Sequence, residues 1–225
     1  MTADPQAKPY KGPESYQIED AELFFGREIE AEQLIAQILS ARLTLVHAPS
    51  GAGKTSLVRA ALTPKLRAEG FRVLPVMRPG LPTPKDVHEG NRYVLSVLQE
   101  LESKRPEKEQ LSWKELAGLT LSAYLQRVWP VPPGEDWHGD VLLFDQFEEV
   151  LTVDPSDREA KQAFFKQVGE VLRDRSRWAL FSMRDEFVAA LDPQGEHALF
   201  QDLTDPHARV EGAERVLEDH AHLTA

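Results

Sequence analysis

The sequence predicts an α/β fold, a three-layer α/β/α sandwich in which helices cover both faces of a mostly parallel sheet. Short apolar runs alternate along the chain with amphipathic stretches of helical spacing. The first run stops at a glycine-rich turn that opens directly into a helical stretch. A later run, Val141 to Phe144, is apolar at every position, which is typical of a strand buried on both faces of a parallel sheet.

The elements follow from hydrophobic periodicity and from turn residues. Helices are expected within 20–42, over 54–69 with a kink or break at Pro64, over 93–101, over 113–129 and over 155–173. Strands are expected at 43–47, 71–77, 141–144 and 178–183. The first two strands and the helix between them form a βαβ unit, whose crossover should be right-handed.

Three regions are expected along the chain. Residues 1–19 are polar and carry several prolines, so they form an N-terminal arm. Residues 20–191 hold the alternating strands and helices and form a single α/β domain. Residues 192–225 carry a weaker pattern, with one short helix expected at 211–222, and form a poorly defined C-terminal tail.

The composition excludes several kinds of protein and of site. The 225 residues include no cysteine, which excludes disulfides, thiolate catalysis and cysteine-ligated metals and fits a reducing compartment. The formal net charge is −11, so the chain has no general field that attracts nucleic acid non-specifically. The sequence has no signal peptide, and no apolar run reaches the roughly 18 residues of a membrane span. We therefore expect a cytoplasmic protein with no membrane contact.

The glycine-rich turn matches the phosphate-binding loop (P-loop) pattern, except that alanine replaces the first glycine. The motif comprises Ala48, Pro49, Ser50, Gly51, Ala52, Gly53, Lys54 and Thr55, with Ser56 next in the helix. Small residues let successive backbone N–H groups surround a phosphate at the positive end of that helix. We expect Lys54 to contact the β- and γ-phosphates and the Thr55 hydroxyl to bind Mg²⁺.

Asp145 is the expected second ligand of Mg²⁺, because it follows a buried strand at the edge where doubly wound sheets place their ligands. Many ATPases carry a glutamate base at the next position, where this chain has Gln146. A glutamine orients water without accepting its proton. Glu148 and Glu149 are alternative bases, and their spacing does not choose between them. Slow turnover is the expected consequence.

Arg184 follows the apolar run at 178–183, and we expect it at the carboxyl end of a strand beside the P-loop. A planar guanidinium there suits contact with a γ-phosphate. The alternative is a surface arginine paired with Asp185 or Glu186.

The motifs together resemble those of STAND-class P-loop NTPases (signal transduction ATPases with numerous domains), specifically the bacterial novel STAND group. They occur in the family's order over about residues 9–191. The motifs are Pro9-Tyr10-Lys11-Gly12, Glu19-Asp20-Ala21, Phe24-Phe25-Gly26-Arg27-Glu28, the stretch Pro49 to Ala60, Arg78-Pro79-Gly80, Asp145-Gln146-Phe147-Glu148-Glu149 and Arg184-Asp185-Glu186-Phe187.

This resemblance implies an ATP-dependent switch with ATP or ADP and Mg²⁺ as ligands, often in bacterial regulation or antiphage defence. It assigns the segment containing Gly26 and Arg27 to the adenine and ribose. It also implies protein partners or effector domains and a nucleotide-dependent oligomer. Family members usually continue into a winged-helix region, whereas this sequence ends in a dissimilar tail. The sequence is therefore interpreted as an isolated module, a truncated piece or a decayed copy, and these alternatives stay open.

Two other functions compete with a switch that hydrolyses ATP slowly. The first is a small-molecule kinase, whose lid should supply several arginines over the transferred phosphate; Lys104, Arg105 and Lys108 are the candidates, among equally many acidic residues. The second is a nucleotide-dependent interaction module without useful turnover, which Gln146 favours.

Overall fold

The computed structural model describes residues 12, 14–84, 89–132 and 136–191, so the helix expected at 211–222 lies outside the described residues. The helices are η1 (Ile18–Leu23), α1 (Glu28–Ser40), α2 (Lys54–Ser56), η2 (Leu57–Leu62), α3 (Thr63–Ala68), α4 (Arg92–Ser103), η3 (Glu107–Glu109), α5 (Trp113–Ala117), α6 (Leu121–Val128), α7 (Glu149–Thr152), α8 (Arg158–Leu172) and η4 (Asp185–Leu191). The strands are β1 (Leu43–Ala48), β2 (Phe71–Val73), β3 (Gly139–Phe144) and β4 (Arg177–Arg184). None of the helices in these ranges is long and apolar enough to cross a membrane.

The described strands form one parallel sheet in the order β1-β4-β3-β2. β1 pairs with β4 from Leu43 opposite Ala179 to Ala48 opposite Arg184. The strands of the expected βαβ unit, β1 and β2, are parallel, but they lie at opposite edges because β4 and β3 stand between them. The strand before the P-loop therefore ends directly beside Arg184.

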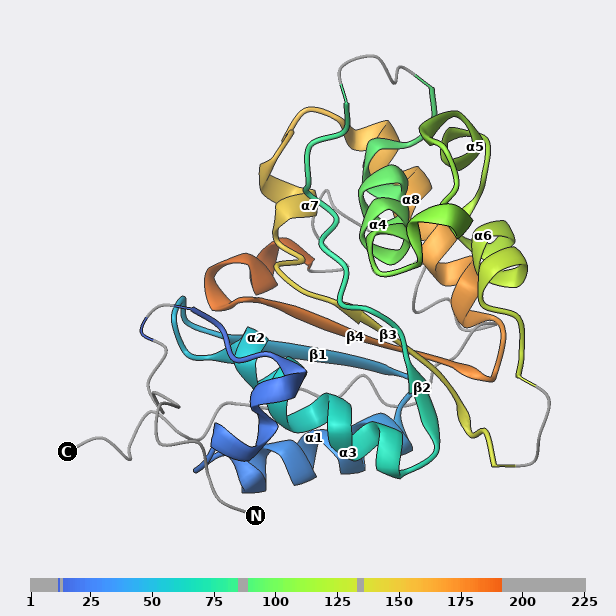
Figure 1. Ribbon diagram of the computed structural model, residues 1–225. Helices are drawn as coiled ribbons and strands as arrows, with labels where there is room; N and C mark the ends of the chain where they lie inside the picture. Colours follow the sequence, from blue (N-terminus) through green and yellow to red (C-terminus); the bar gives the residue numbers. More distant parts are fainter. Residues whose placement is uncertain (1–11, 13, 85–88, 133–135, 192–225) are drawn as a thin grey trace.

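Helices cover both faces of the sheet, which confirms the three-layer architecture (Figure 1). On one face, α1, η2 and α3 pack on a core that includes Leu34, Leu62 and Val141. On the other face, α4, α6 and α8 pack on a larger core, rich in aromatic side chains. Phe144 on β3 and Phe181 on β4 stack there, with ring centroids 4.9 Å apart. Every residue of β3 is buried, as the apolar run predicts.

The helix expected within 20–42 is two shorter elements. η1 ends at Leu23, and α1 begins only at Glu28. Gly26 between them has a φ of 82°, a left-handed conformation that interrupts a helix. The spacing of apolar residues over 29–39 therefore predicts α1 correctly but does not extend to η1.

The helix expected over 113–129 is also two helices, α5 and α6. Ser112 accepts a hydrogen bond from the Glu115 N–H and caps α5, and Thr120 accepts one from the Ala123 N–H and caps α6. The first N–H groups of a helix have no acceptor within the helix, and an N-cap side chain accepts from them. The cap at Thr120 therefore starts a new helix after Gly118. Hydrophobic periodicity continues across the break and conceals it.

The irregularity expected at Pro64 is a change of helix type within a continuous helical run from Lys54 to Ala68. The run is α-helical at its start, Lys54–Ser56, π-helical over Leu57–Leu62 and α-helical again from Thr63. Proline has no N–H, and its ring clashes with the carbonyl four residues earlier in an α-helix. The wider π turn relieves both constraints.

β2 is shorter than the expected stretch of 71–77. It ends at Val73, two residues before Pro75, which has no N–H to donate to a neighbouring strand. The chain nevertheless stays beside β3, since the Leu74 N–H donates to the Val141 carbonyl and the Met77 N–H to the Leu143 carbonyl. β2 is therefore a short strand at the edge of the sheet.

We predict that Gly139→Ala lowers the free energy of unfolding by about 2–4 kcal/mol. Gly139 has a φ of 155°, and a Cβ there would lie 2.3 Å from the Trp178 ring and 2.6 Å from the Ser176 carbonyl oxygen. Urea unfolding followed by circular dichroism measures the change. Gly118→Ala is the matched control, because a Cβ there meets atoms no closer than 3.6 Å. Equal stability of the two variants would contradict the tight approach at Gly139.

Candidate nucleotide-binding site

The P-loop joins β1 to the helical run that begins at Lys54. Gly51 and Gly53 have φ values of 79° and 81°, in the left-handed region that glycine enters without strain. Ala48 ends β1 with a negative φ, since Gln146 is the one non-glycine residue in the described ranges with a positive φ. Alanine therefore fits the first position of the motif.

The Lys54 ammonium group lies folded back over its own loop. Its Nζ donates to the Ala48 carbonyl over 2.7 Å and to the Pro49 carbonyl over 3.0 Å. Burial lowers the pKa of Lys54, and nearby carboxylates, Glu148 foremost and then Asp185 and Asp145, oppose that shift. The loop thus holds a partly desolvated cation beside the place where an anionic group would enter.

Thr55 and Asp145 meet at the carboxyl edge of the sheet, although the strands before them are separated by β4. The Thr55 hydroxyl donates to Asp145 Oδ2 over 2.8 Å. Asp145 is buried, and its Oδ1 accepts from the Gln146 N–H over 3.0 Å. A hydroxyl and a carboxylate oxygen in contact suit Mg²⁺, which usually takes one or two protein oxygens and completes its shell with water and phosphate.

Each of the two candidate bases is paired with an arginine. Glu148 is 6% exposed, and its Oε1 accepts from Arg184 Nε over 3.0 Å. Glu149 accepts from the Arg78 guanidinium. In both carboxylates the second oxygen, Oε2, is buried without a hydrogen-bond partner among the described residues. Each glutamate therefore keeps one unused acceptor. Arg184 also pairs with Glu186, as the alternative in the sequence analysis anticipated.

The Arg78-Pro79-Gly80 loop packs against Glu149, the first residue of α7. A Cβ at Gly80 would lie 2.4 Å from the Glu149 Cβ, so only glycine allows this approach. Ser96 on α4 donates to the Arg78 carbonyl over 2.6 Å and accepts from the Leu81 N–H over 2.9 Å. The loop therefore connects Glu149 to the helical layer on that face.

A cleft of about 860 Å³ collects most of the predicted site residues. Those that line it are Arg27, Ser50, Gly51, Gly53, Lys54, Thr55, Ser56, Asp145, Gln146, Glu148, Glu149 and Arg184. Gly26, Ala48, Pro49 and Ala52 do not line it, although the last three supply carbonyl groups to Lys54 and Arg27. The structure thus brings residues from the N-terminal segment, the P-loop, the segment after β3, α7 and the end of β4 to one place.

Sequence reasoning missed two aromatic residues of the cleft, Tyr16 and Phe24. Their rings pack edge to face with centroids 5.3 Å apart, and the Tyr16 N–H donates to Ser56 Oγ over 3.1 Å. Tyr16 lies within the N-terminal arm expected over 1–19, and Phe24 entered only as part of the family's Phe-Phe-Gly-Arg-Glu motif. The proline-rich arm gives no periodic signal, so only its tertiary contacts reveal this role.

The comparisons with known proteins agree with this geometry. A family model described as novel STAND NTPase 1 matches residues 9–216. The chain belongs to this family. Among solved structures, it is similar to a Walker-type ATPase of Pyrococcus abyssi, with a TM-score of 0.56 and 17% identity. The similarity covers 92% of this chain and 55% of that one, so the chain spans about half the length of that ATPase and shares its fold. None of the curated proteins compared with it matches.

As a novel STAND NTPase, the chain carries the nucleotide-binding module of a P-loop NTPase. The family's Phe-Phe-Gly-Arg-Glu segment has its residues divided between two environments. Arg27 lies on the cleft, where it donates to the Ala52 carbonyl over 2.6 Å and pairs with Glu30. Phe25 is 73% exposed and lies outside the cleft. It lines a smaller hollow between η1, the start of α1, η2 and α3.

We predict that Lys54→Met raises the free energy of unfolding of the nucleotide-free protein by about 0.5–1 kcal/mol, because it removes a cation that burial disfavours. Urea unfolding at low salt measures the change. Lys65→Met is the matched control, since Lys65 makes only an exposed ion pair with Glu32 at 3.4 Å. Destabilisation by Lys54→Met would show instead that the ammonium stabilises the loop through its two carbonyl contacts.

Proposed function

We propose that this chain is an ATP-binding switch module that hydrolyses ATP slowly and serves cytoplasmic signalling, in bacterial regulation or antiphage defence. The contact between Thr55 and Asp145, 2.8 Å long and adjacent to Lys54, is the observation that carries the proposal. It pairs the two side chains that Mg²⁺–ATP needs, at the end of a sheet where P-loop proteins bind phosphate.

The roles within the cleft follow from the chemistry of each group. The P-loop amides and Lys54 hold the β- and γ-phosphates, and Thr55 with Asp145 holds Mg²⁺. A bound Mg²⁺ would neutralise part of the negative charge of the phosphates. Arg27 belongs to the segment that the family resemblance assigns to adenine and ribose. Tyr16 and Phe24 line the same cleft, and we assign them to that part of the nucleotide as well.

Glu148 is the better candidate for the base that accepts the proton of the attacking water. Among the carboxylates around Lys54, Glu148 has the largest electrostatic effect on the ammonium, whereas Glu149 does not contribute appreciably. We therefore assign the proton-accepting role to Glu148, which acts on the lysine that would hold the γ-phosphate. Gln146 orients the water but does not take its proton.

Slow turnover follows from the ion pair between Glu148 and Arg184. While the pair is formed, Arg184 donates to Glu148 and is not free to contact the γ-phosphate. Arg184 reaches its catalytic role only after the pair separates. A switch benefits from this arrangement, because a long-lived ATP state gives time to act on protein partners, effector domains or other copies of the chain.

A small-molecule kinase is a weaker interpretation. Of the described residues on the cleft, the cations are Arg27, Lys54 and Arg184, which is too few for a lid in addition to the P-loop. The candidates from the sequence lie outside the cleft lining. Lys104 lines a different pocket, Arg105 follows α4 and pairs with Glu102 on that helix, and Lys108 lies in η3.

Calorimetry of the full chain with ATP, ADP and GTP tests the proposed ligand. We expect ATP to bind more tightly with Mg²⁺ than without it, and GTP to bind at least about tenfold more weakly, a difference of about 1.4 kcal/mol. Asp145→Asn should remove the Mg²⁺-dependent gain and leave the metal-free affinity unchanged. No binding by the folded wild-type chain, or equal loss for Asp145→Asn without Mg²⁺, would overturn the assignment.

Phosphate release separates the two glutamates. We expect Glu148→Gln to slow ATP hydrolysis by at least about tenfold, because the variant keeps the shape but loses the base. Glu149→Gln is the matched control and should change the rate less than about threefold. The reverse order would move the role to Glu149. Tight ATP binding with no release by the wild-type chain would identify an interaction module without turnover.

A further inference from the structure

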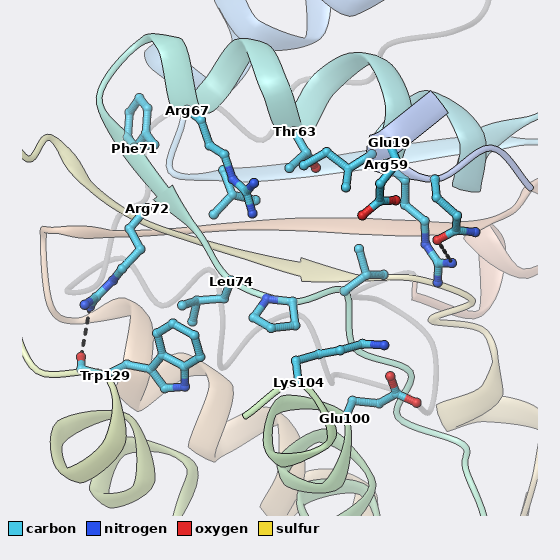
Figure 2. A pocket seen from close by; sticks show the side chains of 15 residues that line it. Glu19, Arg59, Thr63, Arg67, Phe71, Arg72, Leu74, Glu100, Lys104 and Trp129 are labelled. Atoms are coloured by element: carbon cyan, nitrogen blue, oxygen red, sulfur yellow. Dashed lines mark hydrogen bonds between the residues drawn. The ribbon is translucent and has the colours of Figure 1, made fainter. Parts of the chain in front are cut away.

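A second pocket of about 650 Å³ lies along the β2 edge of the sheet, away from the nucleotide-binding cleft (Figure 2). η2 and α3 form one wall, and α4 with Trp129 forms the other. The chain from Phe71 to Val76 runs between these walls. The pocket is thus a groove that follows the β2 edge of the sheet between the two helical layers, and we call it the β2 groove.

The backbone at the floor of the β2 groove has hydrogen-bonding capacity to spare. Within the described residues, β2 pairs with β3 on one side only, because it is the last of the described strands in the sheet. The Leu74 N–H donates to the Val141 carbonyl of β3. Since alternate residues of a strand turn their N–H and C=O to opposite sides, Phe71 and Val73 turn theirs away from β3 and toward the groove. An extended peptide can pair with these groups as an added strand.

The groove has a positive character that the chain as a whole lacks. Arg59 and Arg67 lie on one wall and Lys104 on the other, with their charged ends directed into the groove (Figure 2). Arg67 and Lys104 are exposed, and neither side chain makes a hydrogen bond or an ion pair within the part of the chain that the structure describes. Arg59 donates to a neutral partner, Gln17 Oε1, over 3.0 Å.

Two carboxylates, Glu19 and Glu100, also line the β2 groove. Burial raises the pKa of Glu100, which makes its negative charge less favourable there. Arg72 is already neutralised by two hydrogen bonds to Asp140, 2.7 and 2.8 Å long. Cations with unused donors therefore dominate the groove, on a chain whose net charge is −11.

The apolar part of the groove determines the kind of anion that fits. Leu74, Val76 and Trp129 also line the groove, whose space is large enough for several side chains. A small inorganic anion would leave this surface uncovered, whereas a peptide covers it with alternate side chains. We propose that the β2 groove binds an extended acidic segment of a partner protein, which adds a strand to β2 and places its carboxylates against Arg59, Arg67 and Lys104.

Fluorescence anisotropy with the full chain tests this proposal. The probes are two labelled octapeptides, one alternating glutamate with valine and one alternating lysine with valine. We expect the glutamate peptide to bind at least about tenfold more tightly than the lysine peptide at low salt. Equal affinity for the two peptides, or no binding of the glutamate peptide, would overturn the proposal.

Charge reversal at the groove supplies the matched comparison. Arg67→Glu combined with Lys104→Glu should weaken binding of the glutamate peptide by at least about tenfold. Lys114→Glu combined with Lys166→Glu changes the net charge equally at exposed positions outside the groove lining, and should leave the affinity within about twofold. The same loss in both double variants would reveal only a general charge effect and would contradict a groove site.

Two further readouts distinguish strand addition from simple attraction of an anion. Hydrogen exchange should slow at the Phe71 and Val73 amides when the glutamate peptide binds, because these amides become donors to the added strand. Unchanged exchange at both amides would contradict strand addition. An oligothymidylate of eight nucleotides is the competing polyanion, and if it bound more tightly than the glutamate peptide, the groove would be a nucleic-acid site and the proposal would be wrong.

Discussion

The hydrogen bond between Thr55 and Asp145 is the contact on which the nucleotide-binding site depends. The two residues lie 90 positions apart, and β4 separates the strands that precede them. They meet only because the described strands are parallel, so that the carboxyl ends of β1, β3 and β4 share one edge. The same arrangement places Arg184 opposite Ala48, at the first position of the P-loop. A single antiparallel strand among these three would move one of the groups to the far end of the sheet.

Two arginine–glutamate pairs connect the acidic segment after β3 to different parts of the molecule. Glu148 belongs to the β4 side through Arg184, whereas Glu149 belongs to the loop before α4 through Arg78. Adjacent residues of one turn are therefore connected to opposite halves of the fold. Each pair holds its carboxylate in place through Oε1 and leaves Oε2 without a hydrogen-bond partner among the described residues.

The fold and the P-loop were predictable from the sequence because their signals are local. The glycine-rich turn before Lys54 and the unbroken apolar run of 141–144 each specify one element with its neighbours. Strand order is not local, so the separation of β1 from β2 was not predicted. The pairing of Arg78 with Glu149 was missed for the same reason, since it joins segments 71 residues apart. The place of Tyr16 on the cleft depends on tertiary contacts that no periodicity records.

The segment that begins at Tyr16 lies between the two pockets of the molecule. Tyr16 lines the nucleotide-binding cleft, and its neighbour Gln17 lines the β2 groove and accepts a hydrogen bond from Arg59. A ligand that shifts this segment on one side changes the free energy of binding on the other side. By thermodynamic reciprocity, the effect of nucleotide on the groove equals the effect of a groove ligand on nucleotide affinity. Under the two proposals above, Tyr16 and Gln17 therefore connect the nucleotide site directly to the partner site.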